Sequence, residues 1–140
     1  MERVVADASV IVKFFVNEAH SEAAHRLRDS LISGKIGLIE PSLLFYEVMN
    51  AVRYSKARRF TIGELKLIAE ALENYAFTVF GLDADLMNRT IDVAAKRNIS
   101  FYDAAYVALA INTDSRLYTA DEKLIKAVKS PQIMHIRDFV

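Results

Sequence analysis

The chain has no cysteine among its 140 residues, and glycine and proline are scarce, with four and two copies. Without a thiol, neither a disulfide framework nor a thiolate zinc site can form, and no cysteine nucleophile is available. Low-complexity tracts and repeats are also absent, so the sequence contains no candidate linker. We therefore expect a single domain over residues 1–140, whose 53% hydrophobic content is enough for a sizeable core.

The chain also lacks a long apolar segment and an excess of either charge. Asp7 and Lys13 interrupt the N-terminal apolar run, so it predicts neither a signal peptide nor a membrane span. We expect a soluble, cytoplasmic protein without a membrane partner. Eighteen basic residues balance eighteen acidic residues, so the net charge does not indicate a nucleic-acid-binding module.

One local basic cluster stands out from this neutral background, at the end of a predicted helix. Its members are Arg53, Lys56, Arg58 and Arg59. Cations at this position complement the helix dipole, so solvated helix-end charge explains the cluster, and contact with phosphate is the alternative. The same two explanations apply to Lys13.

Short apolar runs alternate with helical patterns along the whole chain. The runs predict strands at Val4–Ala6, Ile36–Ile39, Phe77–Phe80, Arg116–Tyr118 and Ile133–Ile136. Helices are predicted over residues 8–16, 20–33, 42–58, 62–75, 84–97, 101–113 and 121–129. Thr61 and Glu64 have the spacing of a capping box. This alternation indicates parallel crossovers and a three-layer α/β/α domain.

Four carboxylates lie where simple structural roles do not fully account for them. Asp103 is the one polar residue in the segment FYDAAYVALAI, and Glu47 shares its apolar helix only with Asn50, three residues later. Asp7 follows the first predicted strand directly, and Asp121 follows the fourth. In open parallel sheets, ligands bind at this edge.

Each acid also has a structural explanation. Asp7 lies where a helix N-cap is expected, and Asp103 and Asp121 lie within capping-box patterns. Glu47 is in mid-helix, where only a buried ion pair, with Arg53 or Lys13, would account for it. The four acids can converge only if the first and fourth strands are neighbours.

Converged carboxylates cannot all ionise without compensation, so they take up protons or bind a cation. A site of oxygen ligands alone favours magnesium or manganese, and such ions activate water against a phosphodiester. Ser9, Asn50 and Thr119 are close enough in sequence to orient the acids. The three histidines, His20, His25 and His135, lie outside these motifs, and we expect surface or packing roles for them.

These motifs together resemble the PIN-domain nucleases, and within that family the toxin subunits of VapBC toxin–antitoxin systems. The resemblance rests on VVADASVIVKFF with Asp7, LLFYEVMNAV with Glu47, SFYDAAYVALA with Asp103 and LYTADEKL with Asp121. It runs from Val4 to about Ile136. All four acidic positions are filled, so the sequence contains no departure that would indicate an inactive member.

The resemblance implies more than the residues alone. It implies a five-stranded parallel sheet in the order 3-2-1-4-5, with the four acids gathered around magnesium or manganese. It also implies an endoribonuclease that cleaves single-stranded RNA to leave a 3′-hydroxyl and a 5′-phosphate. The implied partners are a VapB-like antitoxin and a second copy of the chain in a homodimer.

Other functions remain as alternatives. A receiver domain would need adjacent acids after the first strand and an aspartate after the third, where this chain has Gly81 and Leu82. A phosphatase of the haloacid dehalogenase type would need an acid at the position of Ser9. The stronger alternative is a PIN fold that serves as an RNA-binding or assembly module with little turnover.

Overall fold

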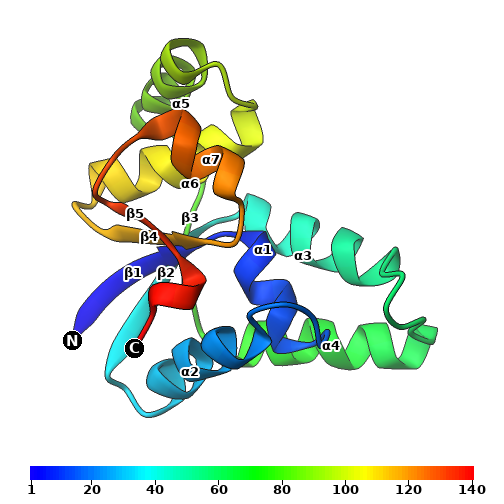
Figure 1. Ribbon diagram of the computed structural model, residues 1–140. Coiled ribbons are helices and arrows are strands. Elements are labelled where there is room, and N and C mark those ends of the chain that lie inside the picture. The colour runs from blue at the N-terminus through cyan, green and yellow to red at the C-terminus, as the bar shows by residue number, and fades with distance from the viewer.

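The computed structural model describes residues 1–140 and contains one five-stranded parallel sheet in the order β3-β2-β1-β4-β5 (Figure 1). The strands are β1 (Glu2–Ala6), β2 (Ile36–Pro41), β3 (Thr78–Phe80), β4 (Arg116–Thr119) and β5 (Ile133–His135). Every neighbouring pair is parallel. The central strand β1 lies between β2 and β4, so the segments that follow β1 and β4 meet at one sheet edge. The predicted fold class and strand order are therefore confirmed.

Helices cover both faces of this sheet. They are α1 (Ala8–Ile11), α2 (Ser21–Ile32), α3 (Leu43–Arg53), α4 (Ile62–Asn74), α5 (Ala84–Arg97), α6 (Phe101–Asn112) and α7 (Glu122–Val128), with short 3₁₀ turns η1 (Val12–Phe14) and η2 (Ile136–Asp138). In Figure 1, α5, α6 and α7 lie on one side of the sheet, and α1 to α4 lie on the other. Helix α6 packs directly on β1, β2 and β4. None of the helices is both long and apolar enough to cross a bilayer.

Two predicted helices differ from the observed elements. The helix expected over residues 8–16 is divided into α1 and η1, and the helix expected over 42–58 ends at Arg53. No residue from Arg53 to Phe60 is buried. Without an apolar face to pack, a helical segment gains little stability, which accounts for the early end of α3. The capping box at the start of α4 is confirmed, with Glu64 N donating to Thr61 Oγ1 at 3.1 Å and Thr61 N donating to Glu64 Oε1 at 2.9 Å.

The core is built around α6, as its apolar sequence predicted. Seven consecutive residues, Ala104–Ala110, are buried, because this helix lies between the sheet and helix α5. Only the first turn of α6, which carries Asp103, reaches the surface at the sheet edge. A rigid, buried helix therefore holds Asp103 beside the ends of β1 and β4.

Candidate active site

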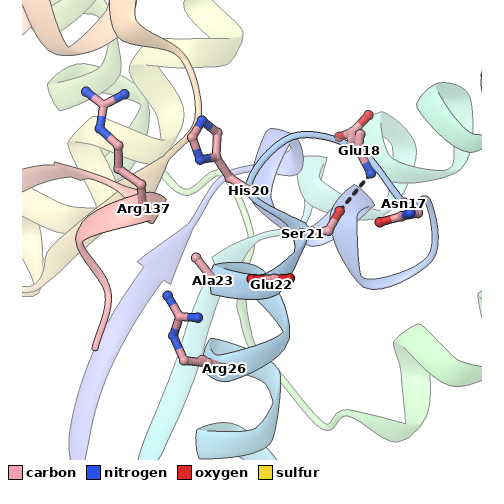
Figure 2. Close-up of a pocket in the computed structure, with 8 residues that line it drawn as sticks. All are labelled: Asn17, Glu18, His20, Ser21, Glu22, Ala23, Arg26 and Arg137. Carbon is pink, nitrogen blue, oxygen red and sulfur yellow. Dashed lines mark hydrogen bonds between the residues drawn. The ribbon is translucent and has the colours of Figure 1, made fainter.

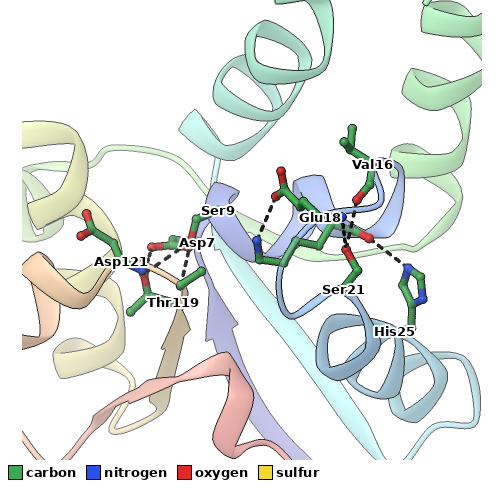
Figure 3. Close-up of polar contacts among 10 residues, drawn as sticks. Asp7, Ser9, Val16, Glu18, Ser21, His25, Thr119 and Asp121 are labelled. Atoms are coloured by element: carbon green, nitrogen blue, oxygen red, sulfur yellow. Dashed lines mark hydrogen bonds and ion pairs between the residues drawn. The ribbon is translucent and has the colours of Figure 1, made fainter. Parts of the chain in front are cut away.

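Asp7 lies directly after β1 and is buried, with 6% of its surface exposed. Its backbone N–H bonds to the Tyr118 carbonyl of β4 at 3.1 Å, which fastens the end of β1 to its neighbour. Asp7 occupies the N-cap position of α1, but its side chain makes no capping hydrogen bond. Its carboxylate accepts instead from two hydroxyls, Ser9 Oγ and Thr119 Oγ1, one on each oxygen (Figure 3). Simple helix capping is therefore the wrong explanation for this acid.

The two hydroxyls are held in the orientation that favours an ionised Asp7. Ser9 Oγ accepts the backbone N–H of Ala120 at 2.9 Å, and Thr119 Oγ1 accepts that of Asp121 at 3.0 Å. Since each hydroxyl already accepts one hydrogen bond, its own proton is free to point at the Asp7 carboxylate. Burial raises the pKa of Asp7 from 3.8 to about 6, and these two bonds oppose the rise.

Asp103 and Asp121 are placed at the same edge by two helix starts. Asp121 is the N-cap of α7, and its Oδ1 accepts the N–H groups of Lys123 and Leu124 at 2.9 and 3.3 Å. The capping explanation therefore holds for Asp121, although its second oxygen remains free of capping bonds. At the start of α6, the cap is Ser100 Oγ, which accepts the Asp103 N–H at 3.0 Å, so the Asp103 carboxylate is not the helix cap.

Glu47 lies in the middle of α3 and is half-buried. Its Oε1 accepts a hydrogen bond from Tyr106 Oη of α6 at 2.7 Å, and it makes no salt bridge. Lys13 pairs with Glu18 instead, and Arg53 stacks over the ring of Tyr54. A buried ion pair is therefore the wrong explanation for Glu47.

The four acids influence one another electrostatically, and Asp103 links them. Burial is the main cause that raises the pKa values of Asp7, Glu47 and Asp103. The charge of Asp103 raises the pKa of Asp7 and Glu47 further, and the charge of Asp121 does the same for Asp103. The structure thus brings four acids from four separate elements within electrostatic reach of one another.

This convergence is not yet a complete ligand set. No group of three or more acidic or histidine side chains is arranged to hold a metal ion. Asp7 is fixed by two hydroxyls, whereas Glu47, Asp103 and Asp121 are only partly buried. These three side chains would therefore have to turn toward Asp7 to share a cation with it.

Sequence reasoning missed two residues that touch this region, Tyr106 and Glu40. Tyr106 is buried and lies three residues after Asp103, so the i, i+3 spacing on α6 was the available signal. Glu40, near the end of β2, is fully buried and accepts the N–H of Ala6 at 2.8 Å through Oε1, while Oε2 has no partner. Its signal was an acid within the apolar run IGLIEP. Burial raises the pKa of Glu40 well above its usual value, and the charge of Asp7 adds to the rise.

Other predicted residues lie away from the acids. Asn50 is exposed and lines a different hollow, with Phe45 and Arg53, so its supporting role stays a prediction. His25 Nε2 lies 3.0 Å from the Lys13 carbonyl oxygen, and the rings of His20 and His135 meet edge to face with centroids 4.8 Å apart. None of the three histidines makes a hydrogen bond or an ion pair with the four acids.

Comparison with known proteins identifies the family of this chain. The PIN domain family matches residues 4–130. The chain is 32% identical over 135 residues to Ribonuclease VapC3 of Pyrobaculum aerophilum, which covers 94% of this chain and 98% of that protein.

Solved structures share the fold at lower sequence identity. FitAcB from Neisseria gonorrhoeae aligns with a TM-score of 0.72 at 16% identity, covering 96% of this chain and 99% of that chain. PAE2754 from Pyrobaculum aerophilum aligns with a TM-score of 0.70 at 21% identity, covering 98% of this chain and 85% of that chain. A toxin–antitoxin complex from Klebsiella pneumoniae aligns with a TM-score of 0.69 at 16% identity, covering 95% of this chain and 97% of that chain. With its sheet order, its convergent acids and a match over most of its length, this chain belongs to the PIN domain family.

Proposed function

We propose that this protein is a metal-dependent endoribonuclease that hydrolyses phosphodiester bonds of single-stranded RNA. Asp7, Glu47, Asp103 and Asp121 are its catalytic carboxylates. The observation that carries the proposal is the environment of Asp7, a buried carboxylate with a hydroxyl donor on each oxygen and the charge of Asp103 in reach. A residue needed only for folding would gain nothing from ionisation at this position, because burial opposes the charge.

The donor chemistry of these acids fits a hard divalent cation, magnesium or manganese. The set contains carboxylate oxygens and neither nitrogen nor sulfur. When bound, such a cation lowers the pKa of a water that attacks phosphorus and stabilises the leaving oxygen. Ser9 and Thr119 hold Asp7 with both oxygens fixed, and Tyr106 restrains Glu47 from the core side. Asp121 keeps one oxygen available while the other caps α7.

We further propose that the protein is the toxin of a type II toxin–antitoxin pair. Support comes from the likeness to Ribonuclease VapC3 and from the fold shared with a toxin–antitoxin complex. The partners in this proposal are a VapB-like antitoxin and a second copy of the chain in a homodimer, acting in the cytoplasm.

The decisive experiment is cleavage of matched single-stranded and hairpin RNAs by the purified protein in manganese, magnesium or EDTA. We expect cleavage of the single strand in either metal, with 5′-phosphate ends, and none in EDTA. The melting temperature should also rise with manganese in the wild type and rise less in Asp103→Asn. Absence of both cleavage and a metal-dependent melting shift would contradict the proposal.

One observation favours a second function, an RNA-binding or assembly module with little turnover. The acids do not form a ready-made set of metal ligands. A protein of this kind would bind RNA and release it intact in manganese. Single-turnover cleavage with protein in excess separates the two functions, because an enzyme would convert all of the RNA.

A further inference from the structure

A hollow of about 530 Å³ begins at the candidate active site and runs between α1–η1 and α3. At one end its lining includes Ser9 and Glu47, which belong to the carboxylate edge. At the other end it includes Ser55 and Lys56, beyond the end of α3. Its volume lies within the range of ligand sites in proteins, which is about 300–1,000 Å³. The hollow is therefore continuous with the acids and large enough for part of a substrate.

Two lysines, Lys13 and Lys56, line this hollow together with Glu18. Lys56 is exposed and makes no ion pair. Lys13, on η1, has only 6% of its surface exposed, and its Nζ lies 2.9 Å from Glu18 Oε1. A buried ammonium needs a counter-charge, and Glu18 supplies it. Glu18 is the more exposed partner, with 39% of its side chain accessible.

Two neighbouring cations, Arg53 and Arg58, are committed elsewhere. Arg58 pairs with Glu64 and lies over the ring of Phe60, 4.8 Å from its centroid. Arg53 stacks on Tyr54 and lines a different hollow, with Asn50. The basic cluster at the end of α3 is thus divided, and only Lys56 among its members lines the hollow that starts at Glu47.

Glu18 has room to leave Lys13. It also borders a second hollow of about 390 Å³, whose lining includes His20, Arg26 and Arg137 (Figure 2). The Glu18 backbone N–H is held by Ser21 Oγ at 2.9 Å, so the main chain is anchored while the carboxylate can change its rotamer. On the second hollow Arg137 is already paired with Glu122, but Arg26 makes no ion pair and offers the displaced carboxylate an alternative partner.

We infer that the hollow between α1–η1 and α3 is the track of the RNA sugar–phosphate backbone, with Lys13 and Lys56 as its phosphate contacts. Glu18 acts as an internal competitor that neutralises Lys13 until a phosphate replaces it. Ammonium groups bind phosphate as point charges, so this contact needs no particular base. The inference rests on the proposed ribonuclease function and adds the path that the substrate strand follows.

The test is binding of a fluorescein-labelled 12-nucleotide polyuridine RNA in EDTA, measured by anisotropy over a series of salt concentrations. A plot of log affinity against log salt has a negative slope, and each lost phosphate contact with a single strand makes this slope less steep by about 0.7. We expect this loss, with several-fold weaker binding, in Lys56→Ala and in Lys13→Met. Glu18→Gln should bind several-fold more tightly, because the competing charge is gone. Arg53→Ala, on the same helix but outside the hollow, is the matched control and should keep the wild-type slope.

Three outcomes would overturn the track. In the first, Lys56→Ala and Glu18→Gln bind RNA as the wild type does, while Arg53→Ala shows a weaker dependence of RNA affinity on salt. In the second, these variants change the binding of a polyglutamate peptide but not of RNA, which would make the hollow a site for an acidic protein segment. Both variants change exposed side chains, so they decide the matter even if Lys13→Met fails to fold. In the third, the wild type cleaves RNA in manganese, but the salt dependence of RNA affinity is the same in the wild type and every variant. This result would defeat the track and leave the ribonuclease function standing.

Discussion

Two neighbouring strands, β1 and β2, each have a buried acid close to their carboxyl end, and the two acids are held very differently. Asp7 after β1 accepts hydrogen bonds from two hydroxyls, which themselves are oriented by backbone N–H groups. Glu40 in β2 accepts a single backbone N–H from Ala6, and its other oxygen has no partner. Burial raises the pKa of both acids, to about 6 for Asp7 and well above the usual value for Glu40.

The difference shows that burial alone does not identify a functional carboxylate. The hydroxyl donors around Asp7 stabilise its charged form close to neutral pH, as a cation ligand requires. Nothing comparable surrounds Glu40, so its uncharged form is the one that the structure favours. We regard Asp7 as part of the site and Glu40 as a support for the end of β1, and four experiments test this division.

The largest effect should follow from Asp7→Asn. We expect RNA cleavage to fall more than about 100-fold, because even residues that merely orient a metal ligand contribute about 10- to 100-fold. Asp83→Asn is the matched control, since Asp83 follows β3, caps α5 and bonds Leu86 N at 2.9 Å. Asparagine caps helices as well as aspartate, so this control should cleave normally. Equal cleavage by Asp7→Asn and the wild type would remove Asp7 from the site.

The same substitution should change how stability depends on pH. In EDTA, Asp7 of the folded protein keeps its proton up to about pH 6, whereas Asp7 of the unfolded chain loses its proton near pH 3.8. The contribution of Asp7 to the free energy of unfolding is therefore greatest below pH 4, and this contribution is lost as the pH rises through 6. At about 1.4 kcal/mol for each pH unit, the loss is about 3 kcal/mol.

Urea unfolding of the wild type and Asp7→Asn between pH 4 and 7.5 measures this loss. The free energy of unfolding of the wild type should fall more steeply than that of the variant, which lacks the titrating group. Glu47 and Asp103 also have raised pKa values and are present in both proteins. Glu40, whose pKa the charge of Asp7 raises, adds to the steeper fall of the wild type. Parallel curves would mean that Asp7 is ionised at little cost in the folded protein.

A smaller loss of cleavage is expected for Tyr106→Phe, which removes the hydroxyl that bonds Glu47. We expect about a 10- to 100-fold decrease, as for other groups that orient a ligand, and a cost in stability of about 1 kcal/mol. The bond lowers the pKa of Glu47, so its loss should also move the acidic limb of the pH–rate profile to higher pH. Tyr75→Phe, which changes a tyrosine packed on Phe14 and Phe77 away from the acids, is the control. An unmoved pH profile would make Tyr106 a packing residue only.

The smallest effect on cleavage is expected for Glu40→Gln. The amide keeps an acceptor for Ala6 N–H and, like the protonated acid, carries no charge. We expect cleavage within a few-fold of the wild type. A loss as large as that of Asp7→Asn would break the comparison and make Glu40 a fifth acid of the site.

The sequence alone predicted the local features of this protein, because periodicity, capping patterns and strand ends are local properties. The five strands, the buried helix α6, the capping box at Thr61 and the position of each candidate acid on its element all follow from residues near one another in the chain. The strand order 3-2-1-4-5 came from the family resemblance and not from these patterns.

Only the tertiary structure decided which groups meet. The hydroxyl of Thr119 reaches Asp7 across 112 positions of sequence, and Tyr106 reaches Glu47 across 59. The structure also divided the basic cluster, leaving Lys56 on the hollow beside Glu47 while Arg58 pairs with Glu64. Such contacts depend on which strands are neighbours and how helices pack on them, and no local pattern records this. The sequence thus determined the elements and their candidate acids, and the packing determined which acid is supported in its charged form.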